Sequence, residues 1–193
     1  MCIRDRSYIP YSKKSMDLFL NRKPDHYCSL GTCLSMAANA YKKSMQIDKE
    51  CKTKHLIGIS VTASLATTYT KIGNHKFYIA VQTESYTKSI ECILVKGARS
   101  REQEEELITE YVLCLIAECC GLEKENPQHE EQINIITTKA EKSWKKLLNN
   151  EVNFVSNDRS IPELIFPGSF NPLHEGHIKL SLIHISEPTR PYW

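Results

Sequence analysis

Apolar positions in the N-terminal third of the chain recur at helical spacing. In residues 29–45 they fall at Leu34, Ala37 and Tyr41, the pattern of one buried helix face. Ser29 stands before the first of them, and a serine there can accept a hydrogen bond from a free amide of the first turn. The pattern therefore predicts a helix over 29–45 that begins after Ser29.

A different pattern follows, with short apolar runs rich in β-branched and aromatic residues. Residues 56–63, 77–84 and 88–97 have this composition, which is typical of strands. Residues 67–76, "TTYTKIGNHK", are rich in turn-forming residues and predict a loop. A polar turn at 85–87 separates the last two runs, so we expect them to form a hairpin.

Ser100 opens the next predicted helix, with Gln103 at the capping-box position and Gly121 as its stop. Its apolar face includes Leu107, Ile108, Tyr111, Val112, Leu115 and Ile116, and four glutamates occupy its first turns. Carboxylates near a helix N-terminus are stabilised by the helix dipole. We expect these glutamates (Glu102, Glu104, Glu105 and Glu106) to form a solvated helix face; a metal site or a basic partner is the alternative.

The segment after Gly121 indicates a change of domain. Residues 122–130 are polar and contain Pro127, so we expect the first domain to end near residue 122. Residues 132–150 then predict a helix that docks back through Ile133, Ile136, Trp144, Leu147 and Leu148, within a linker that spans 123–160. A further strand is expected at 161–166.

Composition excludes several classes of function. A net charge of +2 over 193 residues gives little long-range field, so no nucleic-acid partner is expected. No run reaches the roughly 18 apolar residues of a membrane span, and no signal peptide is recognisable, so no membrane partner is expected. The eight cysteines lack the spacing of a disulfide scaffold or a zinc site, which favours reduced thiols in a cytoplasmic protein.

Both ends of the chain look foreign to it. Residues 1–6, "MCIRDR", and residues 182–193 resemble translated sequencing-adapter DNA. On this interpretation the natural chain lies between them and is a fragment; the alternative is that both are genuine tails. Residues 1–6 and 182–193 are therefore not used to predict the fold.

Residues 166–177, "FPGSFNPLHEGH", carry the most distinctive chemistry. Gly168 permits close approach of the backbone to a ligand, and Pro172 stiffens the turn. His174 and His177 fall three apart where a helix is predicted to begin, so they share one face. A helix N-terminus with two imidazoles and the small Gly176 suits a phosphate chain, because phosphoryl and nucleotidyl transfer require positioning and charge neutralisation.

This run resembles the G-x-F-x-P-x-H-x-G-H signature of the nucleotidylyltransferase superfamily, and all six fixed positions match. The resemblance implies a Rossmann-like domain that begins at 161–181, with His174 and His177 as catalytic residues on a nucleoside triphosphate. Gly168, Ser169, Phe170 and Gly176 would bind the nucleotide. Mg²⁺ is implied for the complete domain and no cofactor for the fragment. A zinc pair and a purely structural turn are the alternatives.

Residues 7–122 resemble the C-terminal domain of the CinA family, which includes nicotinamide-mononucleotide deamidases. The matches are a Y-S segment at Tyr11, the threonine of a T-G-x-x-G-P loop at Thr62, and the arginine of a G-D-R turn at Arg99. The loop glycines and the turn acid are replaced, and no S-C-T-G-G nucleophile segment is present. The resemblance implies an α/β sheet with flanking helices and a vestigial deamidase site at Tyr11, Thr62 and Arg99.

Together the two resemblances imply a degenerate CinA-like domain fused to a nucleotidylyltransferase. The parent protein would join a nucleoside triphosphate to a phosphorylated small molecule and release pyrophosphate, and the fragment would be inactive as a transferase. One alternative is an amidohydrolase of pyridine nucleotides. The other is a non-catalytic module that senses nucleotides or mediates homo-oligomerisation.

Overall fold

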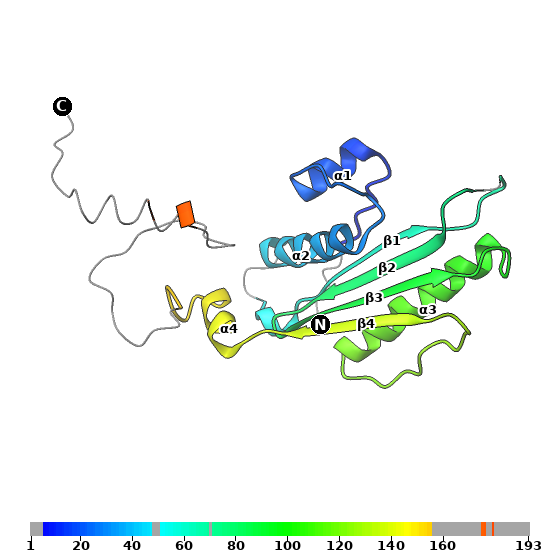
Figure 1. The fold of residues 1–193 in the computed structure, drawn as a ribbon. Coiled ribbons are helices and arrows are strands. Elements are labelled where there is room, and N and C mark those ends of the chain that lie inside the picture. The colour runs from blue at the N-terminus through cyan, green and yellow to red at the C-terminus, as the bar shows by residue number, and fades with distance from the viewer. Residues whose placement is uncertain (1–5, 48–50, 70, 156–174, 177–178, 180–193) are drawn as a thin grey trace, which may run out of the picture. The chain divides into compact units, whose positions relative to one another are not determined.

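A computed structural model describes residues 6–47, 51–69, 71–155, 175–176 and 179. The chain divides into two compact units, residues 1–155 and 156–193. The first unit is a mixed α/β domain with a four-stranded antiparallel sheet flanked by helices, as Figure 1 shows. The α/β class expected from the sequence is confirmed at this level.

The sheet has the order β1-β2-β3-β4, and every neighbouring pair is antiparallel. Three strands follow one another as a meander, and α3 (Arg101–Cys119) lies between the third and fourth in the sequence. The register places Ile59 opposite Val81 and Ile79 opposite Ile90. The strands are β1 (Gly58–Ser64), β2 (His75–Gln82), β3 (Tyr86–Leu94) and β4 (Ile133–Lys139).

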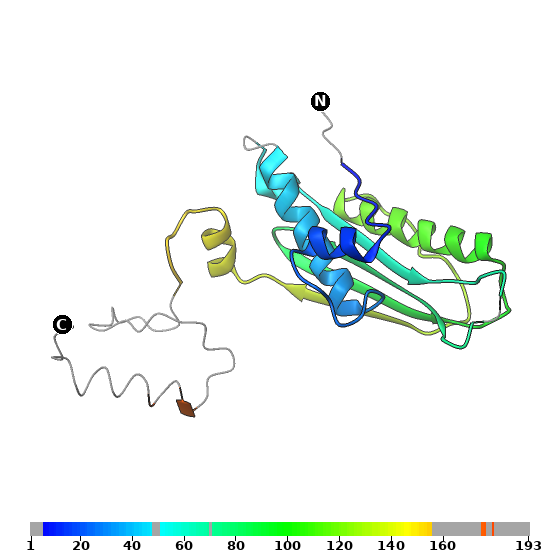
Figure 2. The ribbon, with the colours of Figure 1, turned by 90° about the horizontal axis from the view of Figure 1, so that it is seen from above.

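Helices cover both faces of the sheet. The long helices α2 (Leu30–Ile47) and α3 lie on opposite faces (Figure 1), and α1 (Lys13–Leu20) lies against the outer side of α2 (Figure 2). Because successive side chains of a strand alternate between faces, β2 contributes side chains to two hydrophobic clusters, one on each face of the sheet. Phe77 and Ile79 pack with α3, whereas Tyr78 and Ala80 pack with α2.

The helix boundaries follow the caps expected from the sequence. The Ser100 hydroxyl accepts from the Gln103 amide and the Gln103 side chain accepts from the Ser100 amide, so the predicted capping box is confirmed. Ser29 accepts from the Thr32 amide at the start of α2. Gly121 follows α3 with a φ of 73°, a left-handed conformation that glycine adopts without strain.

The α2 face of the sheet is unusually close to its helix. A β-carbon at Gly58 would overlap the carbonyl oxygen of Ala37 and the amide nitrogen of Tyr41. Beside this contact, the Ser60 hydroxyl donates to the Cys33 carbonyl oxygen at 2.7 Å. Burial raises the pKa of the Cys33 thiol to about 11, so this thiol stays protonated near neutral pH. Cys33 therefore packs rather than reacts.

The helix predicted over 132–150 is wrong in its first half. Residues 133–139 form β4, which pairs with β3 from Cys92 opposite Ile133 to Tyr86 opposite Lys139. The segment contains three isoleucines and two threonines, whose branched β-carbons favour an extended backbone, and the free edge of β3 supplies its hydrogen bonds. Only α4 (Lys142–Leu148) is helical. The sheet thus extends beyond residue 122, where the sequence predicted the domain to end.

Candidate functional site

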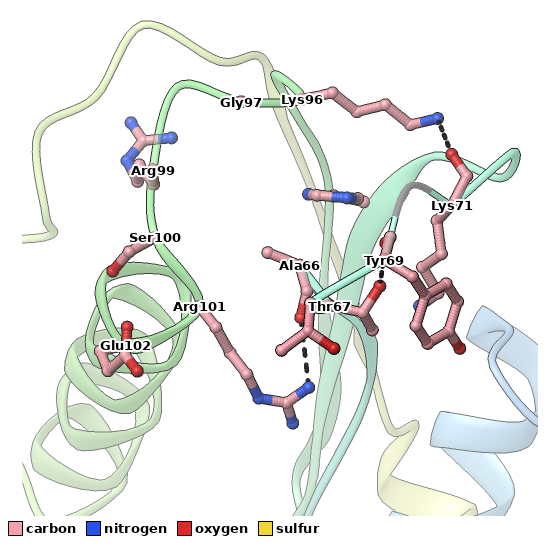
Figure 3. A pocket seen from close by; sticks show the side chains of 12 residues that line it. Ala66, Thr67, Tyr69, Lys71, Lys96, Gly97, Arg99, Ser100, Arg101 and Glu102 are labelled. Atoms are coloured by element: carbon pink, nitrogen blue, oxygen red, sulfur yellow. Dashed lines mark hydrogen bonds between the residues drawn. The ribbon is translucent and has the colours of Figure 1, made fainter.

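A basic cavity lies where the loop after β1 meets the first turn of α3. It measures about 570 Å³, within the range of small-molecule sites. The loop, the end of β3 and the start of α3 supply its walls, as Figure 3 shows. Its ionisable lining side chains include Lys71, His75, Lys96, Arg99, Arg101 and Glu102.

The loop is fixed to α3 through the backbone of Ala66. Its amide donates to Glu104 Oε2 at 2.7 Å, and its carbonyl oxygen accepts from the Arg101 guanidinium at 3.2 Å. Figure 3 shows Arg101 reaching from the first turn of α3 to Ala66. Both polar groups of this residue are satisfied by one helix, so the loop and the helix form a single wall.

Two lysines hold the rest of the loop. Lys96 Nζ donates to the carbonyl oxygens of Lys71 and Ile72 at 3.0 and 2.9 Å. Lys71 Nζ donates to Ser64 Oγ and to the Leu65 carbonyl oxygen at 2.9 and 3.2 Å. All four acceptors are neutral, so these bonds leave both ammonium charges uncompensated. The contact from Lys96 to Lys71 is visible in Figure 3.

A buried histidine–glutamate pair adjoins the cavity, which His75 lines. His75 Nδ1 is 2.7 Å from Glu104 Oε1, and the Glu104 side chain is completely buried. The expectation of a solvated glutamate face is therefore wrong at Glu104. The physical reason is its position, since Glu104 precedes Leu107, Ile108 and Tyr111 by three, four and seven residues and shares their buried helix face. His75 lets the carboxylate be buried with a partner.

A second buried network holds Arg99. Its guanidinium makes two hydrogen bonds to the Glu131 carboxylate, which also accepts from the Val95 amide. Arg99 lowers the pKa of Glu131 to about 2, and Glu131 in turn raises the pKa of Arg99. His129 Nδ1 lies 3.0 Å from Glu131 Oε2 without hydrogen-bond geometry, and its Nε2 meets the Tyr111 hydroxyl at 2.8 Å.

Glu102 gives the cavity one negative charge. Its carboxylate accepts from its own amide and from Ser100 at the N-terminus of α3, and these hydrogen bonds lower its pKa. Arg101 is paired with Glu105 at 2.8 Å, and Arg99 with Glu131. Among the described lining residues, the unpaired charge of the cavity is thus that of Lys71 and Lys96, offset in part by Glu102.

The structure separates the three residues of the expected deamidase site. Arg99 lines the cavity on the α3 face of the sheet. Thr62 lies on the α2 face of β1, where its hydroxyl donates to the Tyr27 carbonyl oxygen at 3.1 Å. Tyr11 precedes α1 with 98% of its surface exposed. Neither Tyr11 nor Thr62 lines the cavity beside Arg99.

The histidine motif lies almost entirely outside the described residues. These exclude His174 and His177, together with Gly168, Ser169 and Phe170. Gly176 is described and is helical, as are Glu175 and Lys179, whose side chains form an exposed ion pair of 3.1 Å.

Sequence reasoning missed His75, Lys71 and Lys96 as members of one site. His75 and Lys71 stood in a segment interpreted only as a loop, and Lys96 at the end of a strand. Only Glu104 carried a signal, because a carboxylate in register with an apolar helix face needs a buried partner. That partner is His75, the first residue of β2, and the tertiary structure brings it against Glu104 of α3.

Within the described ranges, no group of three His, Cys, Asp or Glu side chains is placed to hold a metal ion. None of the described helices has the length and apolar character needed to cross a membrane. Comparison of the chain with protein-family models, curated proteins and solved structures finds no match.

Proposed function

We propose that the α/β domain is a nucleotide-sensing module, which binds the phosphate of a nucleotide in the basic cavity. The observation that carries this proposal is that Lys71 and Lys96 line one cavity of about 570 Å³, and that their ammonium groups bond to neutral oxygens alone among the described residues. A phosphate group would supply the missing negative charge. The cavity volume also suits a ligand larger than phosphate alone.

The rigid surroundings support binding rather than turnover. Ala66 is held through both its amide and its carbonyl group, and Arg99 is held by Glu131. Among the described residues, no hydroxyl that lines the cavity is hydrogen-bonded to His75: the Thr67 hydroxyl donates to the Tyr69 carbonyl oxygen, and the Ser100 hydroxyl accepts from the Gln103 amide. Cys33 and Thr62 lie on the opposite face of the sheet. A preformed cationic cavity without an activated nucleophile is suited to recognition of an anion.

Calorimetric titration of the full chain with AMP, nicotinamide mononucleotide and adenosine tests the proposal. We expect both nucleotides to bind and adenosine not to bind. Lys71→Gln and Lys96→Gln should each weaken binding about 10-fold, the effect of a lost charge-assisted hydrogen bond, and added salt should weaken it further. Glu102→Gln should strengthen binding, because it removes a like charge from the cavity.

Lys14→Gln is the matched control, since Lys14 is exposed on α1 and remote from the cavity lining. If Lys14→Gln and Lys96→Gln weakened nucleotide binding equally, the loss of affinity would reflect the net charge of the protein and not a contact in the cavity. Absence of nucleotide binding to the unsubstituted chain would refute the proposal.

For residues 161–181 we propose the start of a nucleotidylyltransferase domain, supported by the six matched positions of the motif. His174 and His177 would bind a nucleoside triphosphate there, and Mg²⁺ would neutralise phosphate charge in the complete domain. The parent would then release pyrophosphate in joining the nucleotide to a phosphorylated small molecule. Sequencing the parent transcript beyond both ends tests this: an open frame through a full α/β domain supports it, and a natural stop after Trp193 contradicts it.

A further inference from the structure

One polar atom of the His75–Glu104 pair, His75 Nε2, is available to a ligand. Both Glu104 oxygens are occupied, Oε1 by His75 Nδ1 and Oε2 by the Ala66 amide, each at 2.7 Å. His75 Nε2 has no hydrogen-bond partner among the described residues, yet it is not a buried orphan atom, and His75 lines the cavity. With about nine-tenths of the side chain buried, the ring presents this one nitrogen to a ligand.

Glu104 determines what that nitrogen can do. A carboxylate only accepts hydrogen bonds, so Nδ1 must carry the hydrogen that faces Oε1. In the neutral ring Nε2 then carries a lone pair and no hydrogen, so it repels the oxygens of a phosphate dianion. An Nε2–phosphate hydrogen bond therefore requires one additional proton, on the ring or on the phosphate.

The charges around His75 indicate which phosphate is favoured. Lys71, from the loop before β2, and Lys96, after β3, supply two uncompensated positive charges. A monoester phosphate carries up to two negative charges, whereas a diester carries one. Among the described lining residues, the other charged groups are the paired Arg99, in the turn before α3, and the paired Arg101 and the Glu102 carboxylate, in its first turn.

We propose that the cavity takes a phosphate monoester together with one proton, which is shared between His75 Nε2 and a phosphate oxygen. This inference rests on the proposed nucleotide binding and specifies its ligand as a terminal monoester. Because Glu104 holds both His75 and Ala66, the carboxylate couples the protonated ring to the loop that forms the cavity wall. His75 is thus the proton-accepting contact of the site.

Calorimetry of the full chain at pH 8, in buffers of different ionisation enthalpy, measures the protons taken up with the ligand. AMP is a dianion at this pH, since the second pKa of a phosphate monoester is about 6. We expect the unsubstituted chain to take up about one proton with AMP. Cyclic AMP, a diester with the same base and sugar, should bind at least about 10-fold more weakly and take up no proton.

Two substitutions separate the roles of the pair. His75→Gln should weaken AMP binding about 10-fold and abolish proton uptake. Glu104→Gln should keep binding but lose the uptake, because its amide nitrogen donates to Nδ1 and leaves the hydrogen of the neutral ring on Nε2. Circular dichroism and thermal unfolding check that each variant is folded. If a variant is unfolded, the proton uptake of the unsubstituted chain with AMP still tests the proposal.

The outcomes distinguish the two proposals. No AMP binding to the unsubstituted chain overturns both. AMP binding with no proton uptake, or with the same uptake after His75→Gln, overturns the role of His75 alone. Equal affinity for AMP and cyclic AMP overturns the monoester preference.

Discussion

Glu131 keeps its charge in a nearly closed site because Arg99 contacts both of its carboxylate oxygens. The Glu131 side chain is only 3% exposed, whereas Arg99 reaches solvent at 23%. The pair joins the segment before β4 to the turn before α3, and the Val95 amide adds a third hydrogen bond. The network also holds Arg99 at the edge of the cavity, so one carboxylate links local stability to the geometry of the site.

The stability that Glu131 provides should depend on pH in a defined window. Its pKa falls from an ordinary 4.5 to about 2 on folding, mainly through the hydrogen bonds from Arg99. A carboxyl whose pKa is lowered by folding stabilises the protein fully above the unfolded value, and this stabilisation disappears as pH falls through the folded value. We expect Glu131→Gln to lower the free energy of unfolding by about 2 kcal/mol at pH 7.

Urea unfolding at pH 7, 5, 4 and 3 measures this difference. The gap between the unsubstituted chain and Glu131→Gln should be constant down to about pH 5 and shrink from there toward pH 2. Glu130→Gln is the control, because Glu130 is the exposed neighbour and should leave the free energy of unfolding unchanged. A gap that stays constant down to pH 3 would show that the ion pair does not carry the effect.

At the scale of elements, the contact between α2 and β1 depends on one missing side chain. Gly58 brings the strand against the backbone of α2 at Ala37 and Tyr41, and the Ser60–Cys33 hydrogen bond follows one pleat along. Here the glycine serves close approach rather than an unusual backbone conformation, because it is absent from the positive-φ residues. The helix can therefore lie closer to the sheet at this point than it could if a side chain stood between them.

Gly58→Ala should lower the free energy of unfolding by roughly 3 kcal/mol, because its new β-carbon meets helix backbone, which cannot move like a side-chain tip. Gly31→Ala is the matched control in α2, since nothing lies within 4 Å of the position that its new methyl group would take. That change should leave stability equal or raise it by up to about 1 kcal/mol through lower chain entropy in the unfolded state. Equal midpoints for the two variants in urea would contradict the close-approach interpretation.

At the scale of the whole molecule, the first compact unit ends well beyond the polar segment at 122–130. β4 adds the fourth strand, and the segment before it supplies Glu131 to Arg99 and His129 to Tyr111. Pro127 also accepts a hydrogen bond from the Tyr111 hydroxyl through its carbonyl oxygen. The polar composition that suggested a linker therefore belongs to a connection tied down to α3.

Two truncations test this domain boundary. A chain of residues 1–155 contains the complete first unit and should unfold at the same temperature as the full chain. A chain of residues 1–122 lacks β4 and leaves Arg99 and Tyr111 without these partners, so its melting temperature should fall by about 10 °C or more. Thermal circular dichroism measures both. Equal melting temperatures for the two truncations would place the boundary near residue 122 after all.

Local patterns in the sequence determined the elements whose signals are local. The capping box at Ser100 and Gln103, the stop at Gly121 and the β2–β3 hairpin depend on residues a few positions apart. The capping box and the glycine stop are found where they were predicted, and the hairpin forms with each strand beginning two residues earlier than predicted. The α/β class was implied by the resemblance to a CinA-like domain, and the fold agrees with it at that level. The motif around His174 and His177 is likewise a property of the sequence alone, since those residues lie outside the described structure.

Tertiary structure decided what depends on partners distant in the sequence. Residues 133–139 became a strand because their branched side chains favour an extended backbone and β3 offered an open edge. The branched composition is a local signal, whereas the open edge is decided by the fold. Glu104 became buried because folding brought His75 against it from 29 positions away. Lys71 and Lys96 came to share a cavity for the same reason. A site assembled from three separate segments has no spacing that a sequence pattern can record, so its chemistry becomes visible only in the fold.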